Sequence, residues 1–435
     1  MSLFGRVIGR LRSVSNGIFG SGKRDFPSPT VLFVDSEPNI IEGHKRMIHS
    51  LRPDWKAHFA EDASSAMAVL MHNPVDVVIT ELNIPCRDGT DLIGGVQKLF
   101  PHIVRMILSS ESDVRSETVL QATQSAHQFL VKPCKAENLL EHIEHAMELR
   151  YLLKTPELMK IIGGMPYLPS LPPLYFKLVA ALSSPNTSVS DIGDIISKDV
   201  SMTGRVLHLV NSAFFGLPRK ITSPREAATL LGINTLKSLV LYVKLFFAAP
   251  ESTIPGLSLE ELWAHSSLAG RIAQEIVKSE GGNRLVMEEA MLGGMMHDVG
   301  KLLILEEKSY LNRVIRKLGA EVSFDDAEYQ EFSTSHAEIG AYLLGIWGIP
   351  DIIVAAVACH HRPMQITQTG FSVVTAVYVA NAILHAGLDK PLVIDDEYLD
   401  HIGVFGRLNT WKQIANTILE DAKEKAAQRT MANIP

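Results

Sequence analysis

The alternation of short apolar runs with amphipathic segments between residues 30 and 150 constrains the fold of this chain more than any other feature. Each apolar run has the length of one buried strand, and the intervening segments repeat their apolar residues at helical spacing. Such alternation indicates a parallel sheet covered by helices on both faces. The predicted fold class of this part is an α/β doubly wound fold with a five-stranded parallel sheet. The runs are TVLFVD, KAHFAE, DVVITEL, IVRMILSS and QFLVKP.

Polar side chains follow four of these predicted strands. Asp35 comes after the first run, Glu81 after the third, Ser109 after the fourth and Lys132 after the fifth. In doubly wound sheets the functional crevice lies outside the carboxyl ends of the strands. We therefore expect these four side chains to meet at one edge of the sheet.

From about residue 155 onward, apolar residues take a helical spacing and strand signals nearly disappear. Ser223 has the position of an N-cap, with Pro224 at the first helical position and Glu226 closing a capping box. Ser188 and Asp191 have the same three-residue spacing, and Gly232 marks a helix end. These signals predict an all-α domain of the second half.

The domain organisation follows from these changes of pattern. A basic amphipathic arm and Gly/Ser-rich tether come first, and the predicted sheet domain follows. A helical connector then leads to the all-α domain, and a helical tail closes the chain. The predicted bounds are 1–27, 28–150, 151–168, 169–390 and 391–435.

Composition narrows the function classes and the compartment. The net charge is −7 with a pI of about 6.2, which disfavours non-specific binding of nucleic acids. We therefore expect no direct DNA binding. Three cysteines without paired spacing indicate a reducing, cytoplasmic environment. Residues 1–12 place apolar residues on one helical face with arginines elsewhere, which leaves two interpretations: a poorly ordered arm, or a helix that contacts a membrane or partner.

Residues 30–150 resemble the receiver domain of response regulators over its full length. VLFVDSE resembles the acidic pocket of that family, and VVITELNIPCRDG stands where the family carries its phosphoryl-accepting Asp. ILSS supplies the hydroxyl residue and FLVKP the Lys-Pro pair. The resemblance implies that the pocket contains Asp35, Ser36, Glu81, Asn83, Ser109, Phe129 and Lys132.

Two positions depart from the receiver pattern. Glu81 replaces the acceptor Asp, and Ser36 replaces the second acid of the usual pair. Losing one acid weakens a Mg²⁺ site, so we expect weak Mg²⁺ binding or none, although the Asn83 carbonyl could still face a metal. Because Glu is one methylene longer than Asp, Glu81 could pair with Lys132 and Ser109 without phosphorylation. The alternative is a degenerate domain that serves as a packing or dimerisation surface.

A histidine-rich set in the second half predicts a metal centre. Neutral imidazoles and a carboxylate suit Fe, Mn, Zn or Mg, and a His-Asp dipeptide at a helix end can place both side chains on one ion. Such an ion would lower the pKa of a bound water. The alternative is that these groups only hydrogen-bond one another. The candidate ligands are His265, His297, Asp298, His336, His360 and His361.

The order of these motifs resembles the HD superfamily of metal-dependent phosphohydrolases. LPSLPP, DVSMTGRVLHLVNSAFFG and ITSPREAATLLGINTLKSLVL narrow the resemblance to its HDOD branch over 160–385. A further Asp completes the metal set of the hydrolases, but the corresponding helix here offers Asn381. The HHRPMQ stretch also lacks the Gly-Tyr-Pro signature of cyclic-dinucleotide phosphodiesterases. The resemblance therefore implies a regulatory module more than an enzyme.

The two resemblances imply a bacterial signal-transduction protein, with a phosphoacceptor-less receiver coupled to an HDOD output module. The output module would bind a signalling protein or a nucleotide, and a homodimer is expected because receiver domains commonly dimerise. The alternative is a receiver-controlled metal-dependent phosphohydrolase that acts on a nucleotide or cyclic dinucleotide.

Overall fold

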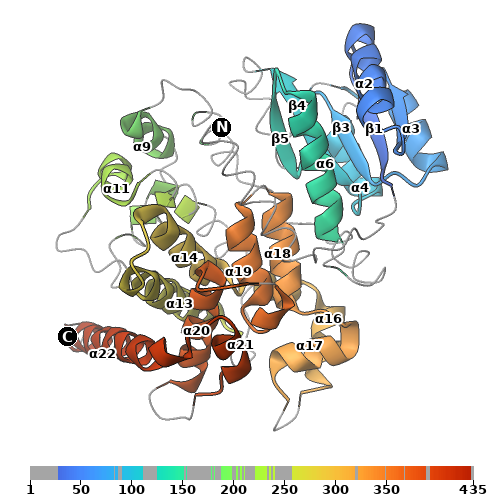
Figure 1. The fold of residues 1–435 in the computed structure, drawn as a ribbon. Coiled ribbons are helices and arrows are strands. Elements are labelled where there is room, and N and C mark those ends of the chain that lie inside the picture. The colour runs from blue at the N-terminus through green and yellow to red at the C-terminus, as the bar shows by residue number, and fades with distance from the viewer. Residues whose placement is uncertain are drawn as a thin grey trace. The chain divides into compact units, whose positions relative to one another are not determined.

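The structure is a computed structural model. It describes residues 28–82, 84–86, 91–110, 125–150, 188–197, 221–232, 257–318, 322–347, 349–366, 368–387 and 392–432, with single residues or pairs between 153 and 240. These residues form two compact units (Figure 1). We call residues 28–150 the sheet unit, and residues 188–345 with 349–432 the helical unit.

The sheet unit contains the five predicted strands in one parallel sheet. The strand order is β2-β1-β3-β4-β5, so β1 has the next strand along the chain on one side and β3 on the other. The chain therefore reverses its winding direction at β1, and in doubly wound sheets functional residues gather at the carboxyl ends of the strands beside this switch point, here β1 and β3. The strands are β1 (Thr30–Val34), β2 (Lys56–Ala60), β3 (Val77–Thr80), β4 (Val104–Ser110) and β5 (Gln128–Lys132).

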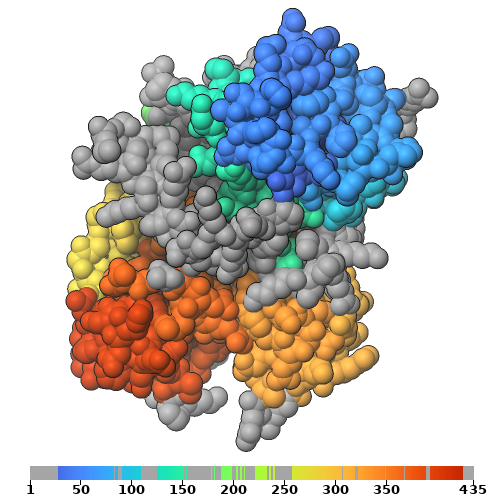
Figure 2. Space-filling model, turned by 45° about the vertical axis from the view of Figure 1, so that its right-hand side comes forward, coloured from blue at the N-terminus to red at the C-terminus, as the bar shows by residue number. Residues whose placement is uncertain are grey.

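Helices cover both faces of the sheet, which confirms the doubly wound fold. Alternate residues of β1 serve the two sides: Phe33 belongs to a core with α2 (Pro38–Leu51) and α6 (Ala136–Arg150), whereas Leu32 packs with α3 (Ala63–His72) and α4 (Leu92–Leu99). Figure 1 shows α6 lying along the strands, and in Figure 2 the blue residues of this unit form one closely packed body.

Several predicted features lie outside the described residues. They include the N-terminal arm of residues 1–27, the connector of residues 151–168 apart from Leu153, and Asn83. The side chains of Ser109 and Phe129 are also outside them, although the strands that carry these two residues are described.

The N-caps predicted at Ser188 and Ser223 are present, but the capping box predicted at Ser223 forms differently. Ser188 and Asp191 cap α9 (Val189–Ser197) reciprocally, with Ser188 N–H 2.8 Å from Asp191 Oδ2 and Asp191 N–H 3.2 Å from Ser188 Oγ. Ser223 caps α11 (Pro224–Leu231). There the Glu226 carboxylate accepts from Thr222 N–H, one residue before the cap. Gly232 ends α11 with a φ of 88°, a conformation that favours glycine.

The rest of the helical unit is built around α13 and α14. The long helix α13 packs against α14, α20 and α22, and α14 also contacts α19. The helices are α13 (Leu259–Ser279), α14 (Arg284–Met296), α15 (Val299–Glu306), α16 (Lys308–Ile315), α17 (Phe324–Phe332), α18 (His336–Ile346), α19 (Asp351–Cys359), α20 (Val373–Ala386), α21 (Asp396–His401) and α22 (Leu408–Ala432).

Two close helix contacts fix the backbone on both sides of the His297–Asp298 dipeptide. A Cβ added to Gly294 would lie 2.6 Å from Gly270 Cα, so α14 meets α13 backbone to backbone. A Cβ on Gly300 would lie within 1.9 Å of the His336 carbonyl oxygen, so α15 meets the start of α18 in the same way. Only glycine permits such close approaches.

The predicted C-terminal helix forms as α22 and belongs to the helical unit. Trp411 is fully buried, and its indole N–H donates to Glu280 over 3.0 Å. Arg271 of α13 pairs with Asp421 of α22 over 3.0 Å. Among the described helices, none is both long enough and apolar enough to cross a membrane.

Candidate functional site

At the carboxyl ends of β1 and β5 the sheet unit has an ion pair between a buried carboxylate and a partly exposed ammonium. Asp35 follows β1 and is 3% exposed, and Lys132 ends β5. Lys132 Nζ lies 2.7 Å from Asp35 Oδ2, and Asp35 Oδ1 accepts from Glu37 N–H over 3.0 Å. Both oxygens of this carboxylate are therefore occupied by groups of the chain itself.

Glu81 makes a different contact from the one expected. Its Oε1 accepts from the backbone N–H of Ser36 over 2.8 Å. The predicted ion pair between Glu81 and Lys132 is absent among the described residues, so this prediction is wrong. The ammonium of Lys132 pairs instead with Asp35, which is more buried. The Glu81 carboxylate turns instead toward the amide that follows β1, where a charge-assisted hydrogen bond satisfies it.

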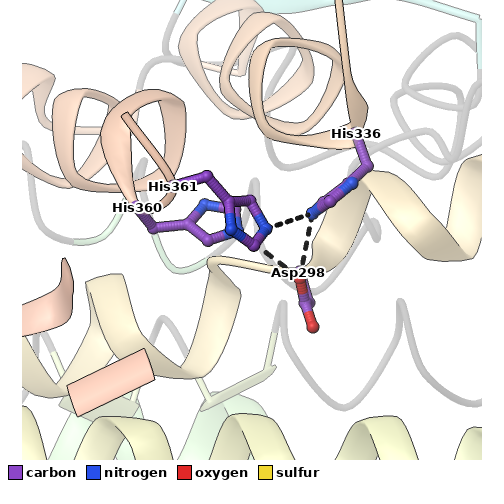
Figure 3. A group of neighbouring side chains, drawn as sticks. All are labelled: Asp298, His336, His360 and His361. Carbon is purple, nitrogen blue, oxygen red and sulfur yellow. Dashed lines mark hydrogen bonds and ion pairs between the residues drawn. The ribbon is translucent and has the colours of Figure 1, made fainter. Parts of the chain in front are cut away.

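In the helical unit, the structure brings all six predicted metal ligands together around Asp298. His265 comes from α13, the His297–Asp298 dipeptide joins α14 to α15, and His336 begins α18. His360 and His361 follow the last residue of α19. Asp298 is 2% exposed, and Figure 3 shows His336, His360 and His361 directed toward it.

The ring nitrogens crowd both oxygens of Asp298. Oδ1 lies 3.3 Å from His336 Nε2 and 3.6 Å from His360 Nε2. Oδ2 lies 3.4 Å from His297 Nε2 and 4.0 Å from His265 Nε2. His361 Nε2 completes the first group at 3.2 Å from His336 Nε2. These residues form two overlapping groups, Asp298 with His336, His360 and His361, and Asp298 with His265 and His297. Within each group the candidate ligand atoms all lie within 4.8 Å of one another.

Three of the imidazoles are held with Nε2 toward the centre. His297 Nδ1 lies 2.6 Å from Gly294 O, and His360 Nδ1 lies 2.7 Å from Val357 O. His336 Nδ1 lies 2.6 Å from Glu328 Oε2. Since these partners only accept, each Nδ1 carries a proton, as in histidines that bind metals through Nε2.

Three polar atoms of this buried centre lack a hydrogen-bond partner among the described residues. They are His297 Nε2, His360 Nε2 and Asp298 Oδ1. Such atoms are rare in folded proteins and call for an explanation, for which an ion is one candidate. Imidazole nitrogens and a carboxylate oxygen are suitable donors for a divalent transition metal, so the residues fit the group that the sequence predicted.

The electrostatics keep most of these groups in the form that ligates. Burial lowers the pKa of His265 and of His360 to about 3, so both rings are neutral near pH 7. Burial would raise the pKa of Asp298, but His297 and Lys301 outweigh it and hold that pKa well below its usual value. Burial would lower the pKa of His336, yet Glu328 raises it to about 9.

Lys301 is part of the centre. Its Nζ lies 2.8 Å from Asp298 Oδ2, and its side chain is 9% exposed. Lys301 and Asp298 therefore form a buried ion pair.

Asn381 lies where the sequence predicted the missing acid. It is on α20, and its Oδ1 lies 3.0 Å from His265 Nε2. An amide oxygen accepts, so this contact places a proton on His265 Nε2. The amide therefore closes one side of the centre without adding a charge.

Two neighbours of the cluster were missed by the sequence analysis. His385 lies with its ring 5.0 Å from that of His265, and its place four residues after Asn381 on one helix face was an available signal. Glu328 is fully buried and holds His336 and Tyr310, but nothing in FDDAEYQEF distinguishes it from the acids around it.

A cavity of about 530 Å³ lies beside the cluster, and His385 is one of its lining residues. It reaches the centre through His360 and His361 and is also lined by Asn381, Tyr378 and Asp395. A molecule that entered this cavity would meet two imidazoles of the cluster directly.

A doubly wound sheet followed along the chain by a helical unit with a His-Asp centre is the arrangement that the sequence predicted for a receiver domain joined to an HDOD domain. The family models agree: residues 31–144 are a response regulator receiver domain and residues 168–363 are an HDOD domain. The fusion of these domains supports a role as a signal-transduction regulator.

Bacterial proteins are similar to parts of this chain. An uncharacterized protein of Treponema pallidum is 26% identical over 216 residues, which are 49% of this chain and 41% of that protein. The hydrogenase transcriptional regulatory protein HoxA of Cupriavidus necator is 27% identical over 125 residues, 28% of this chain and 25% of HoxA. The chain thus matches less than half the length of each relative.

A crystal structure of an HDOD domain protein of unknown function from Geobacter sulfurreducens is 22% identical and covers 67% of this chain and 96% of its own, with a TM-score of 0.47.

Proposed function

We propose that this chain is a signal-transduction regulator whose HDOD domain holds a divalent metal ion at the cluster around Asp298. The observation that carries this proposal is the set of three buried, unpartnered ligand atoms: His297 Nε2, His360 Nε2 and Asp298 Oδ1. A cluster that served only as an inherited hydrogen-bond network would pair these atoms, because an unpaired buried polar atom costs roughly 1–3 kcal/mol.

The ion would be held by imidazole nitrogens and the Asp298 carboxylate. When bound, a divalent ion supplies Lewis acidity and a site for an anionic oxygen. The chain's own groups do the rest. Glu328 fixes His336 through Nδ1, the carbonyl oxygens of Gly294 and Val357 fix His297 and His360, and the cavity gives a ligand access through His361.

The receiver domain in this proposal works without phosphoryl transfer. Glu81 stands where the acceptor Asp is expected, and its carboxylate is bound to Ser36 N–H. Lys132, which would bind a phosphoryl oxygen, is paired with Asp35. These contacts support a pocket with a permanent charge arrangement. Its signal would then come from a protein partner that reads the surface of the receiver domain.

The test is metal analysis of the full chain, purified without added chelator, followed by treatment with acetyl phosphate. We expect bound Fe, Mn or Zn that His360→Ala removes, and no stoichiometric phosphorylation. Wild-type protein that binds no divalent metal when offered each in turn would contradict the first part. Rapid labelling of Glu81 would contradict the second.

A second candidate function is phosphoester hydrolysis, and the cavity beside the cluster favours it. The cavity would accept a ligand of nucleotide size, and Lys301 lies at the centre where a phosphate would be bound. Turnover of bis-p-nitrophenyl phosphate or of nucleotides by the Mn²⁺-loaded chain, lost in His297→Ala and Asp298→Ala, would establish this function. A metal-loaded chain without turnover would leave the regulatory function alone.

A further inference from the structure

The geometry points to a centre for a single metal ion on the Oδ1 side of Asp298, with the ammonium of Lys301 occupying the Oδ2 side as a built-in cation. This inference rests on the proposed metal binding and goes beyond it, because it assigns the number of ions and the ligands. Of the five predicted histidines, three bind the ion together with Asp298 Oδ1, and two do not. The three are His336, His360 and His361.

The two oxygens of Asp298 face different surroundings. Oδ2 accepts a hydrogen bond from Lys301 Nζ over 2.8 Å, whereas the cation at Oδ1 is the His336 ring, whose Nε2 lies 3.3 Å away. An imidazole can give up its proton to an incoming metal and then ligate it, which an ammonium paired with a carboxylate does not do. The Lys301 side chain is 9% exposed and Asp298 is 2% exposed, so their charges meet out of bulk water. A divalent ion on Oδ2 would have to displace that ammonium or lie beside it, and two cations at such a distance repel strongly in a buried site.

The remaining groups on the Oδ2 side are poor partners for an ion. His265 Nε2 is 4.0 Å from Oδ2 and carries the proton that it donates to Asn381 Oδ1 over 3.0 Å. A protonated ring nitrogen has no lone pair for a metal. His297 Nε2 is unpartnered, but a single nitrogen beside an ammonium does not make a cation site.

The Oδ1 side has what an ion requires. Oδ1 and His360 Nε2 make no hydrogen bond among the described residues and lie 3.6 Å apart. His336 Nε2 is 3.3 Å from Oδ1, and His361 Nε2 is 3.2 Å from His336 Nε2. His336 must release its Nε2 proton to ligate, because its pKa of about 9 leaves the ring charged near pH 7. Three nitrogens and one carboxylate oxygen then make the ligand number of a four-coordinate transition-metal site. His361 also lines the cavity, which gives the ion an entry path.

The test counts ions by titrating metal-free full-length protein with Co²⁺, followed by its visible absorption and by elemental analysis after gel filtration. We expect one ion per chain. His361→Ala should weaken binding at least tenfold, and His265→Ala should keep one ion with the wild-type spectrum. Circular dichroism of both variants shows that each is folded.

A gain-of-binding variant tests the role of Lys301. The double substitution Lys301→Met with Asn381→Asp removes the ammonium and restores an acid, so we expect a second Co²⁺ ion per chain. Two ions in the wild type, or binding lost in His265→Ala and kept in His361→Ala, would overturn the inference while leaving metal binding intact. A wild-type chain that binds no Co²⁺, Mn²⁺ or Zn²⁺ would overturn the proposed function itself.

Discussion

The receiver pocket and the histidine cluster both lack one acid that their families carry, yet they respond to the loss in opposite ways. In the receiver pocket, Asp35 and Lys132 pair with each other and Glu81 binds a backbone amide. In the cluster, a carboxylate oxygen and two imidazole nitrogens stay unpartnered although they are buried. The receiver pocket has satisfied its own polar groups, whereas the cluster has kept donor atoms available.

This difference separates two outcomes of losing a catalytic group. A pocket whose charges are internally paired gains stability from them and has no need of a ligand. A buried site with unpartnered donors loses stability until something binds, since each such atom is costly. The comparison therefore predicts that the cluster, and not the receiver pocket, responds to added metal.

The largest expected effect is the loss of stability of the metal-free helical unit in mild acid. Burial lowers the pKa of several of its histidines, in two cases to about 3. Below the unfolded value near 6.5 the unfolded chain takes up protons that the folded chain refuses, so stability falls with pH by up to about 1.4 kcal/mol per unit for each histidine. The histidines are His265, His360, His361 and His385.

The measurement is urea denaturation in EDTA between pH 7 and pH 5, with the two units followed separately by limited proteolysis. His336 does not oppose this loss: its folded pKa of about 9 gives stability that is complete below pH 6.5 and is lost only as the pH rises through 9. In the receiver domain burial also lowers the pKa of His44, His102, His127 and His142, and that of His127 well below its usual value, so this unit also loses some stability in acid. A helical unit whose stability does not change between pH 7 and pH 5 would show that the cluster histidines are not buried neutral.

The next effect compares the two buried carboxylates by Asp298→Ala and Asp35→Ala. Removing Asp298 leaves the Lys301 ammonium buried and unpaired, and such losses cost about 3–5 kcal/mol. Removing Asp35 leaves Lys132, whose side chain is 24% exposed, so water screens the charge and we expect about 1 kcal/mol. Denaturation midpoints of the two variants give the comparison.

Adding Lys301→Met to Asp298→Ala is the control for that experiment. The double variant removes both charges, so it should recover much of the lost stability. If it is as unstable as Asp298→Ala alone, the ion pair is not the reason for the effect.

The third prediction concerns Glu328, which was not predicted to belong to the site. Glu328→Gln keeps the shape but gives up the charge that fixes His336, and losing such an outer partner weakens metal binding by about 10–100-fold. The matched control is Glu331→Gln on the same helix, whose carboxylate pairs with Arg313 away from the cluster. Co²⁺ affinities of the two variants should differ; equal affinities would remove Glu328 from the site.

The smallest effect is expected at Glu81. Glu81→Gln keeps an oxygen that can accept from Ser36 N–H and loses only the charge assistance, so the receiver domain should lose about 1 kcal/mol or less. Thermal unfolding of the receiver domain measures this change. A loss above about 3 kcal/mol, the upper end for hydrogen bonds to charged groups, would contradict the observed contact.

Sequence alone predicted the periodic parts of the fold and the members of the cluster. All five strands formed, because alternating apolar runs must bury both faces of a parallel sheet. Four of the six cluster residues were predicted because His297–Asp298 and His360–His361 are visible as dipeptides. Contacts made across the fold could not be read in this way, such as Lys132 with Asp35 or His336 with Glu328, because they depend on which of several nearby charges is more buried.

The carbonyl oxygens that hold His297 and His360 have a consequence for how this protein can vary. Each oxygen belongs to a residue three positions earlier, in the last turn of α14 or α19. The orientation of each ring is thus tied to where its helix stops. One residue inserted in that turn would rotate the ring by about 100° about the helix axis and carry it about 1.5 Å along it. Insertions or deletions in these two turns would therefore destroy the geometry of the cluster without any substitution of its residues. Insertions in loops elsewhere would leave that geometry unchanged.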